Sequence, residues 1–409
     1  MRTYGVGSAL ILAVFLAACG GAESRWAGTM SDSAGVTIVS NTDVGIWATG
    51  EEWTFEEELR IGSVEGDTEY QFGEVGRMAV DSKGRIFVLD GQAQHIRVYL
   101  PDGTYEQTVG ARGGGPGELR AGLAVLVGPG DSLLVPDGQN LRVNRYAPDG
   151  SSAGSFRMVL EEGRPMAWKA STTGIVAEQI RPLSMLLPGE AVENPEDVIL
   201  HVAIDGTVID TLLEFPSGRS LGPQGMTLYA TEPAWDLSDD GQLVFGAADE
   251  YRISVYADGQ LRRIITRPFE RRPVADQDIE AILGEMERRW DEAGISPEVR
   301  ERIWSRIHFS DFYPAFQAVA IGPQGTIWVG RVKPASELNA KELEYYHEWP
   351  VHEWDVFDAE GRLLGTVTMP ERFNPMAFRG DKVYGAWRDE LDVGYVVVLR
   401  IVGVGATGT

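Results

Sequence analysis

Apolar residues recur along this chain in short runs that are separated by glycine-containing turns. Residues 78–89 show the unit clearly: an apolar stretch, a turn with Asp81 and Gly84, and a second apolar stretch. Short apolar runs bounded by such turns predict β-strands joined as hairpins. The unit occurs six times, with its turn glycine at Gly84, Gly130, Gly174, Gly241, Gly325 and Gly380.

A second turn, an acidic residue followed by glycine, comes after most of these hairpins. Its glycines are Gly103, Gly150, Gly206, Gly259 and Gly361. The first four lie at intervals of roughly fifty residues, which is typical of a four-stranded propeller blade. An acidic residue and glycine between two strands indicates a tight hairpin, because glycine adopts positive φ without strain. The pattern therefore predicts an all-β protein, a six-bladed β-propeller with four-stranded blades.

The sixth hairpin unit has no second turn, because the chain ends soon after its third strand at residues 395–402. Residues 53–61 form an additional predicted strand near the amino terminus, with partial alternation of apolar residues. Pairing these two strands would complete the last blade and remove an open sheet edge. We therefore predict that an N-terminal strand closes the ring. Two separate β-sandwich domains are the alternative, and the regular spacing disfavours them.

The interval between Gly259 and Gly361 is about twice the others, which indicates an insertion. Within it, apolar residues recur at helical spacing at Ile279, Ile282, Leu283, Met286 and Trp290. Asp276 is a candidate N-cap for this helix and Gly294 a natural stop, and Ser296 with Pro297 begins a second helix. We predict one helical insertion at about residues 274–310, either a lid over the central channel or a packing element.

Composition supports this architecture and excludes one class of partner. Glycine accounts for 49 of 409 residues, an excess that fits many tight turns and not a helical bundle. The formal net charge of −25 and the lack of a basic block predict no binding to nucleic acid. The single cysteine, Cys19, can form neither an internal disulfide nor a multi-thiolate metal site. We expect a monomer.

The first eighteen residues have the anatomy of a targeting segment. Arg2 precedes an apolar run, residues 6–18, that is too short to span a bilayer. The run ends in Leu16-Ala17-Ala18-Cys19-Gly20, which resembles a bacterial lipobox. The resemblance implies cleavage before Cys19, attachment of acyl chains such as palmitate, and a membrane partner reached through this lipid. A secretory signal with an incidental cysteine is the alternative. Gly20 after the cysteine implies the outer membrane within the bacterial cell envelope.

The repeats, the lipobox and the glycine-rich run from Gly110 to Leu119 together resemble secreted six-bladed propeller lipoproteins of bacteria, similar to NHL-repeat proteins. The opening of the mature region, Asp32 to Asn41, resembles this group as well, whereas Leu119 replaces its usual aromatic residue. The resemblance covers nearly the whole mature chain and implies fold more than function. The expected organisation is a signal peptide (1–18), a lipidated cysteine and flexible tether (19–35), the propeller (36–402) and a flexible tail (403–409).

The long loops of the predicted propeller all emerge on one face, hereafter the loop-rich face. These loops are the connections between blades and the turns between the second and third strands of each blade. Functional residues commonly lie on loops of this kind, because the sheets hold the loops in place. Arginines recur in them, and in an acidic protein they could form a positive mouth for an anionic ligand; surface ion pairing is the alternative. The candidate ligand-binding residues are Arg77, Arg112, Glu118, Arg120, Arg181, Arg219, Arg331 and Arg372.

Two further motifs carry weaker chemical signals. The run Gly113-Gly114-Gly115-Pro116-Gly117 lacks the Lys-Ser/Thr of a phosphate-binding loop, so we predict a structural crossing between blades. There, Glu118 would accept backbone hydrogen bonds. His347 and His352, each followed by Glu and Trp, are weak candidates for metal ligands because their odd spacing places them on opposite faces of a strand.

No catalytic constellation is evident in the sequence, and Gly-x-Ser-x-Gly is absent. We therefore predict a lipid-anchored, extracytoplasmic binding or scaffold module for a peptide, glycan or partner protein, without a cofactor. The alternative is a metal-assisted propeller enzyme, a lyase or lactonase-like hydrolase, with a divalent cation held near the channel mouth.

Overall fold

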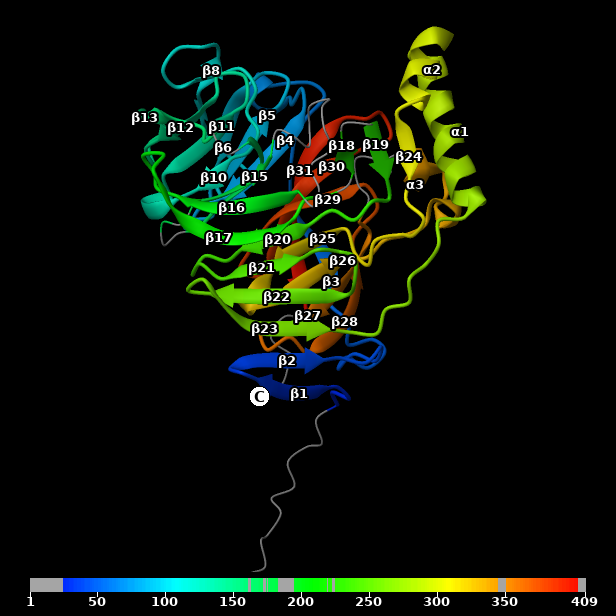
Figure 1. Ribbon diagram of the computed structural model, residues 1–409. Helices are drawn as coiled ribbons and strands as arrows, with labels where there is room; N and C mark the ends of the chain where they lie inside the picture. Colours follow the sequence, from blue (N-terminus) through cyan, green and yellow to red (C-terminus); the bar gives the residue numbers. More distant parts are fainter. Residues whose placement is uncertain are drawn as a thin grey trace, which may run out of the picture.

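The six predicted blades are present in the structure of the protein, a computed structural model (Figure 1). It describes residues 25–160, 163–171, 174, 176–182, 195–218, 220–222, 225–344 and 351–403. Each blade is an antiparallel meander, and the first strand of each lies at the centre of the ring. The all-β fold class is therefore confirmed as a six-bladed β-propeller with four-stranded blades.

The first three blades follow one another without interruption by helices. Their strands are β4 (Val75–Val80), β5 (Ile86–Asp90), β6 (His95–Tyr99), β7 (Tyr105–Val109), β10 (Leu126–Val127), β11 (Leu133–Asp137), β12 (Arg142–Tyr146), β13 (Ser152–Arg157), β14 (Arg164–Ala170), β15 (Val176–Arg181), β16 (Glu196–Val202) and β17 (Val208–Pro216). A short parallel pair in the first inter-blade loop consists of β8 (Ala111–Arg112) and β9 (Glu118–Leu119).

The last three blades contain the insertion and the ring closure. Their strands are β20 (Ala234–Leu237), β21 (Leu243–Gly246), β22 (Arg252–Ala257), β23 (Gln260–Thr266), β25 (Ala318–Ile321), β26 (Ile327–Gly330), β27 (Glu353–Phe357), β28 (Leu363–Thr368), β29 (Phe373–Arg379), β30 (Lys382–Arg388), β31 (Gly394–Val402) and β3 (Thr54–Ile61). β3 pairs antiparallel with β31, from Thr54 opposite Val402 to Ile61 opposite Val396. The predicted closure by an N-terminal strand is confirmed.

The predicted turn glycines stand where the chain reverses. The five glycines of the acidic-Gly turns all have φ between 67° and 91°, a region that other residues rarely adopt. At Gly103, an added Cβ would also meet the Leu59 side chain at 2.8 Å. The glycine excess of this chain thus has a direct structural use.

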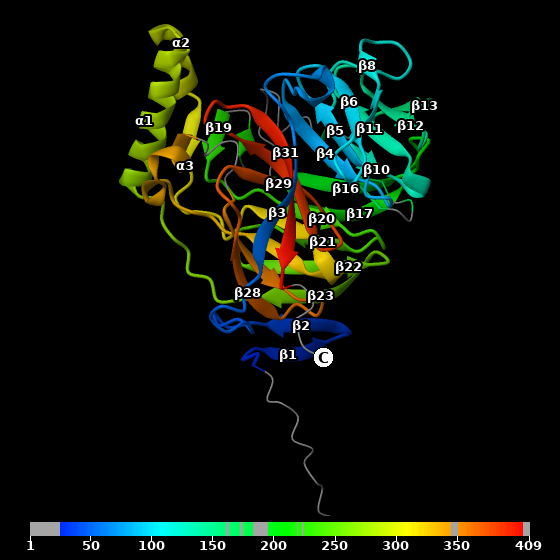
Figure 2. The same ribbon diagram turned by 180° about the vertical axis from the view of Figure 1, so that it is seen from behind.

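A segment before β3, residues 36–53, wraps the outside of the ring and is called the strap below. β1 (Thr29–Ser33) and β2 (Val36–Ser40) form a hairpin, and β2 pairs in parallel with β23 on the fourth blade (Figures 1 and 2). Farther along, the backbone N–H of Trp47 donates to Leu364 on β28 of the fifth blade, at 2.8 Å. The strap therefore ties three consecutive blades together. β1 begins inside the segment that the sequence predicted to be a tether, because the β1–β2 hairpin extends the fourth sheet.

Asn41 is the central residue of the strap, and its side chain is almost wholly buried. Its Oδ1 accepts the backbone N–H of Leu363 at 2.7 Å and the indole N–H of Trp26 at 2.8 Å. Its Nδ2 donates to the carbonyls of Gly361 at 3.0 Å and Thr266 at 3.2 Å. One amide thus joins the fourth blade, the fifth blade and the N-terminal segment.

The hydrophobic core is divided among the interfaces between neighbouring blades. Separate clusters of buried residues fill the interfaces around the ring. The interface between the fifth and sixth blades is the most aromatic, with Trp328 fully buried and Trp53 6.0 Å from it between ring centroids. Burial of each Val, Leu or Ile side chain contributes about 1.5–3 kcal/mol to the free energy of folding. Because such side chains fill every interface, the stabilising free energy is spread around the whole ring.

The insertion forms an accessory unit with two neighbouring loops, called the cap below. It comprises β18 (Leu221–Gly222), β19 (Gly225–Leu228), α1 (Asp276–Glu292), α2 (Pro297–Trp304), β24 (Ile307–Phe309) and α3 (Ala340–Glu344). β19 pairs in parallel with β24, and Trp290 packs on Trp304 with ring centroids 4.5 Å apart. α1 and α2 project from one side of the ring in both views (Figures 1 and 2). Within the described residues, no helix has the length and apolar character needed to cross a bilayer.

Asp278 joins α1 to the loop between β26 and β27. This side chain is 1% exposed, and it accepts hydrogen bonds from the backbone N–H and hydroxyl of Ser336 and from the N–H of Ala275. Burial raises the pKa of the Asp278 carboxyl, but these hydrogen bonds outweigh burial and leave the pKa below its ordinary value. The charged carboxylate of Asp278 therefore caps the N-terminus of α1 through Ala275. The same carboxylate binds Ser336 in the loop between β26 and β27.

Candidate ligand-binding channel

The six innermost strands surround a central channel of about 1590 Å³. Every one of them contributes to its wall, namely β4, β10, β14, β20, β25 and β29. Inner strands of a propeller run in the same direction around the axis, so their first residues surround one mouth and their last residues the other. The first mouth lies on the loop-rich face. The volume exceeds the roughly 300–1,000 Å³ of pockets that hold drug-sized ligands.

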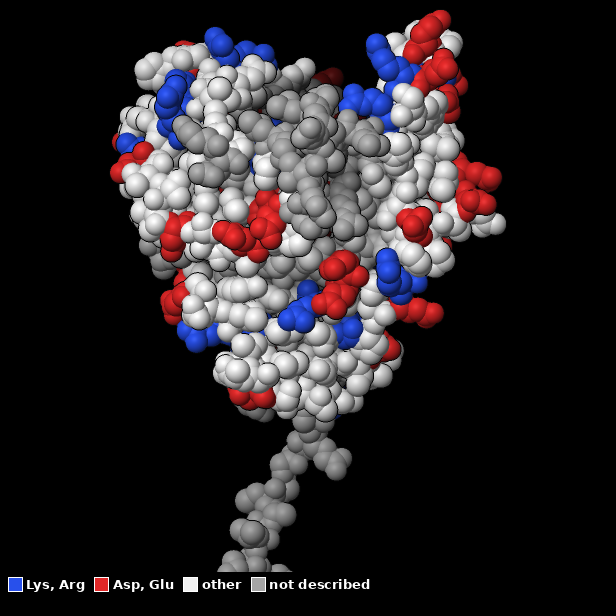
Figure 3. Space-filling view, in the orientation of Figure 1, with Lys and Arg blue, Asp and Glu red and all other residues white. Residues whose placement is uncertain are grey.

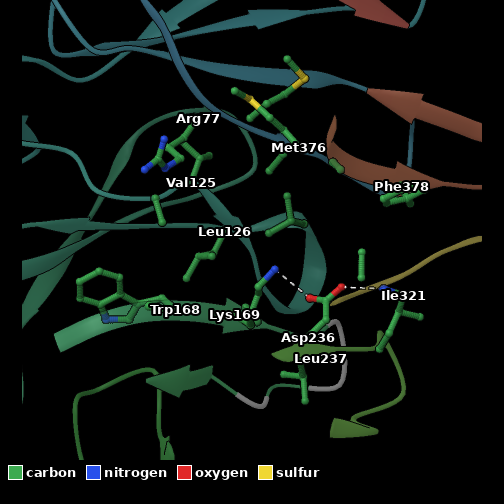
Figure 4. Close-up of a pocket in the computed structure, with 18 of the residues that line it drawn as sticks. Arg77, Val125, Leu126, Trp168, Lys169, Asp236, Leu237, Ile321, Met376 and Phe378 are labelled. Atoms are coloured by element: carbon green, nitrogen blue, oxygen red, sulfur yellow. Dashed lines mark hydrogen bonds and ion pairs between the residues drawn. The ribbon is translucent and has the colours of Figure 1, made fainter. Parts of the chain in front are cut away.

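The channel wall is mainly apolar, and part of it is open to solvent. Val125, Leu126, Met376 and Phe378 line it (Figure 4). Met166 lines it as well. Near the loop-rich mouth, Leu123 is 38% exposed, Leu141 50% and Met166 37%. Contiguous exposed apolar surface in a concave site is typical of a binding site. Methionine is flexible, so such a wall can adapt to ligands of different shape.

One ion pair joins the inner strands of the third and fourth blades near their last residues, toward the mouth opposite the loop-rich face. The Lys169 ammonium lies 2.8 Å from Asp236 Oδ1, and Asp236 Oδ2 accepts the N–H of Ile321 at 2.8 Å (Figure 4). Lys169 is partly exposed, whereas Asp236 is largely shielded. The charges of Lys169 and Asp236 offset each other at that end of the channel.

Charge is unequal at the two mouths. Arg77, near the start of β4, and Arg164, at the start of β14, line the loop-rich end. Arg77 donates to the carbonyl of Gly76 at 2.7 Å, and neither guanidinium forms an ion pair with any described residue. The opposite end is lined by Asp239, Asp240 and Arg379, with Arg379 3.5 Å from Asp239. Two guanidinium groups therefore line the loop-rich mouth, whereas two carboxylates and one guanidinium line the opposite mouth.

A side groove of about 560 Å³ opens from the loop-rich mouth between the sixth and first blades. It shares Arg77 and Met376 with the channel and continues past Glu74 to the turn that contains Arg388 and Asp392. Arg388 and Asp392 pair at 2.9 Å. Arg77 thus stands where two connected cavities meet.

A buried carboxyl lies behind the channel wall. Glu178 on β15 is 2% exposed and faces Trp168, a channel residue, across the β14–β15 ladder. Its Oε1 has no hydrogen-bond partner among the described residues. Burial raises the pKa of Glu178 to about 7, against a small opposing effect of the Trp168 indole.

The arginines predicted from sequence divide into several groups in the structure. Arg77 alone lines the channel. Arg112 and Arg120 are exposed on the inter-blade loop beside Glu118, and Arg112 donates to the carbonyl of Gln92. Arg372 is half-buried just before β29, with φ at 61°. Arg219 lies outside the described residues.

Arg181 and Arg331 are held by carboxylates. The Arg181 side chain is 1% exposed, and its Nη2 lies 3.0 Å from Asp197 and 3.1 Å from Glu232. The guanidinium of Arg331 lies 3.1 Å from Asp355 and 3.3 Å from Glu353. These pairs join loops to strands on the loop-rich face. Basic and acidic side chains are interspersed over the surface seen in Figure 3, without a large patch of one sign.

The glycine-rich run forms a crossing between blades, as expected. The N–H of Gly115 donates to Glu118 Oε2 at 2.7 Å, so Glu118 stabilises the loop internally. Asn140 donates to the carbonyl of Gly113 at 3.0 Å, and Arg142 donates to Gly114 at 3.3 Å. These contacts orient the carbonyls of the loop toward the second blade.

Neither His352 nor the helices α1 and α2 of the cap line the channel. His347 lies outside the described residues, and the carbonyl of His352 accepts the N–H of Met369 at 2.8 Å. In the part of the chain that the structure describes, no group of three or more His, Cys, Asp or Glu could hold a metal ion. None of the residues that line the channel belongs to α1 or α2.

Sequence reasoning missed Arg164, Lys169 and Asp236, which lie in three different positions along two inner strands. The available signal for Arg164 was its position at the start of an inner strand, which resembles that of Arg77. No sequence signal indicated that Lys169 and Asp236 would meet, because their contact depends on how neighbouring blades are set around the axis.

Comparison with known proteins supports the fold. No protein-family profile matches this chain, and no curated protein matches its sequence. Among solved structures, a candidate exported protein from Bacteroides fragilis is 11% identical, over 89% of this chain and 99% of that chain, with a TM-score of 0.51. A member of the DUF4221 family from Bacteroides vulgatus is 12% identical, over 86% and 98%, with a TM-score of 0.53. Virginiamycin B lyase from Staphylococcus aureus is 11% identical, over 86% and 100%, with a TM-score of 0.45. The chain is thus similar in fold to the two Bacteroides proteins.

Proposed function

We propose that this protein is a lipid-anchored binding module of the bacterial cell envelope and that its ligand occupies the central channel. One observation carries the proposal: an open, mainly apolar channel whose loop-rich mouth bears Arg77 and Arg164 without an ion-pair partner among the described residues. Exposed apolar side chains in a concave site are typical of a ligand site, and a guanidinium offers paired donors to an anionic group. A ligand with an anionic group and an apolar body could use both features at once.

The location follows from the targeting segment and is supported by one structural neighbour. The Cys19 context resembles a lipobox, and the Bacteroides fragilis propeller that shares this fold is a candidate exported protein. Several acyl chains on Cys19 would anchor the protein stably, since each buried CH₂ contributes about 0.8 kcal/mol. The segment up to Gly28 would then join this lipid to β1 and the strap.

Binding in the channel can be tested with a variant that fills its mouth. Met166→Trp places a bulky side chain at the 37% exposed position in the channel, and Met226→Trp does so at a 38% exposed position on β19, away from it. We expect equilibrium dialysis against a panel of peptides, glycans and fatty acids to identify a ligand that Met166→Trp excludes and Met226→Trp retains. Equal binding by the two variants would place the ligand outside the channel.

The lipid anchor has a separate test. We expect Cys19→Ser to move the protein from the membrane fraction to the soluble fraction after cell lysis, because the acylated sulfur is lost. Gly20→Ser is the matched control and should leave the protein in the membrane fraction. Retention of Cys19→Ser in the membrane would contradict anchoring by lipid.

A further inference from the structure

Three exposed apolar side chains gather at the loop-rich mouth, on the side of the second and third blades. Leu123 lies just before β10, Leu141 in the turn between β11 and β12, and Met166 on β14. These three residues, hereafter the apolar patch, are each between 37% and 50% exposed. An added Cβ at Gly138, in the same turn as Leu141, would meet the Leu123 side chain at 3.0 Å, so Leu123 packs against this turn. Large apolar side chains that gather from separate segments in a concave site are typical of a ligand surface.

Leu141 is not explained by the turn that contains it. The turn at residues 138–141 has the same length as the turn at 91–94 in the first blade, and its last residue has a positive φ in both, 52° at Leu141 and 56° at Gln94. Gln94 is 8% exposed, and its Oε1 accepts the backbone N–H of Gly122 at 2.8 Å, which joins the first blade to the loop before the second. Leu141 is half exposed in a conformation that a bulky residue adopts at a cost. A leucine at this position therefore points to a contact outside the chain.

The same mouth offers donors for one anionic group. Arg77 and Arg164 are both exposed, and neither forms an ion pair with any described residue. Met166 lies two residues from Arg164 on β14, about 7 Å along the strand, so the apolar patch begins beside a guanidinium. The planar donors of a guanidinium match the two oxygens of a carboxylate.

A monoanionic carboxylate suits this mouth better than a phosphate ester or a glycan. Phosphate sites are commonly built from the N-terminus of a helix or from successive backbone N–H groups, and no α-helix begins among the described residues that line the channel. The formal net charge of −25 also opposes entry of a dianion more strongly than entry of a monoanion. A glycan matches less well because leucine and methionine side chains cannot donate hydrogen bonds to its hydroxyl groups.

The length of the apolar wall limits the size of the ligand. β14 runs from Arg164 at the loop-rich mouth to Lys169, which pairs with Asp236 toward the opposite mouth. At about 3.3 Å per residue, this stretch spans roughly 17 Å. With C–C bonds of about 1.5 Å, an extended alkyl chain of about a dozen carbons has a similar reach. Val125 and Leu126 of the neighbouring blade also line the channel (Figure 4).

Resting on the proposed binding function, we infer that the channel binds single-chain fatty carboxylates. The carboxylate contacts the guanidinium groups of Arg77 and Arg164 at the loop-rich mouth. The alkyl chain covers the apolar patch and continues along the apolar wall toward the opposite mouth. Because methionine side chains are flexible, Met166 lets chains of different shape pack, so recognition depends on the charged head and on chain length.

The test uses the full chain with Cys19→Ser, which removes the protein's own acyl chains. Octanoate, decanoate and dodecanoate, each paired with the alcohol of the same length, are studied below the concentrations at which they form micelles, and bound ligand is quantified by equilibrium dialysis. Each added CH₂ group should tighten binding by about two- to fourfold, because it buries apolar surface. Each alcohol should bind about tenfold or more weakly than its carboxylate, because charged hydrogen bonds to arginine are lost.

One pair of variants assigns the preference for carboxylate to the arginines. Arg77→Gln/Arg164→Gln should bind each carboxylate and its alcohol equally. Arg112→Gln, exposed on the same face but outside the channel lining, should retain the difference. The replaced side chains are exposed, so an unchanged unfolding midpoint serves as the folding check.

A second pair assigns the contribution of the alkyl chain to the apolar patch. Leu141→Gln introduces the residue type that the first blade has at the corresponding turn, and it should weaken dodecanoate binding by about three- to tenfold. Leu391→Gln, at an 80% exposed position outside the channel lining, is the control and should bind dodecanoate like the parent. Equal affinities of these two variants would remove Leu141 from the site and overturn the assignment of the chain to the apolar patch.

The outcomes separate this inference from the proposed function. Equal binding of carboxylates and alcohols by the parent protein would overturn the assignment of the head group, as would tighter binding of dodecyl phosphate than of dodecanoate. A peptide or glycan that Met166→Trp excludes, with no fatty carboxylate bound, would overturn this inference and leave the channel as a ligand site. Absence of any ligand that Met166→Trp excludes would overturn both the proposed function and this inference.

Discussion

Asn41→Ala should lower the free energy of unfolding by about 3–5 kcal/mol, the largest effect we expect from a single substitution. The substitution removes one side chain that satisfies two backbone carbonyls, one backbone N–H and the indole of Trp26. Buried polar groups that lose their partners each cost about 1–3 kcal/mol. The loss also loosens the strap where it crosses from the fourth to the fifth blade.

Urea denaturation monitored by tryptophan fluorescence measures this effect, with Thr42→Ala as the control. Thr42 is adjacent in the strap, is only half-buried, and makes a local contact with Val44. We expect Thr42→Ala to change the free energy of unfolding by less than about 0.5 kcal/mol. Similar midpoints for the two variants would show that the strap does not hold the ring in the way described.

Glu178→Gln should stabilise the protein by about 2–3 kcal/mol at pH 8 and have little effect at pH 5. Burial raises the pKa of Glu178 from its ordinary value of 4.5 to about 7. Between these values the folded protein retains a proton that the unfolded chain releases, so stability falls as the pH rises through this window. Above pH 7 the native state contains a buried, charged carboxylate, which the glutamine variant lacks.

The measurement is the difference in urea midpoint between parent and variant, converted to free energy at each pH. Glu371→Gln, at an exposed position just before β29, is the control and should show no such dependence on pH. A Glu178→Gln variant that is destabilised equally at pH 5 and pH 8 would mean that the carboxyl is stabilised in its charged form by contacts other than those seen.

The blades were predictable because their determinants are local. Each acidic-Gly turn specifies a hairpin through residues that are adjacent in the sequence. The regular recurrence of these turns indicates the repeat, and it does not depend on contacts between blades. The closing strand, β3, was predictable by counting, since the last blade lacked one strand. Local signals also located α1 and α2, although Asp276 is the first residue of α1 and Ala275 precedes it as the N-cap.

The site was less predictable because its residues come together only in the ring. Sequence placed eight candidate residues on one face, but whether an arginine is available for a ligand depends on distant carboxylates. Arg181 is paired with Asp197 on the adjacent strand and with Glu232 from the next inter-blade connection. Arg164 has no such partner among the described residues, and its position at the start of an inner strand does not by itself show this.

The same reasoning explains why Asn41 could not be identified in advance. Its residue type suits a turn or a cap as well as a buried junction. Its partners Thr266 and Gly361 lie more than two hundred residues away in the sequence. Only the circular arrangement of the blades brings these backbone groups to one side chain.

The most direct test of the channel as the ligand site is an NMR spectrum of methionine methyl groups. Protein labelled with ¹³C at these methyls is recorded with and without the tightest-binding member of the panel. We predict that the signals of Met166 and Met376, which line the channel, shift, while those of Met30 and Met226, which are similarly exposed elsewhere, do not. Shifts at Met226 with unchanged signals from Met166 and Met376 would place the ligand on the cap and contradict the account.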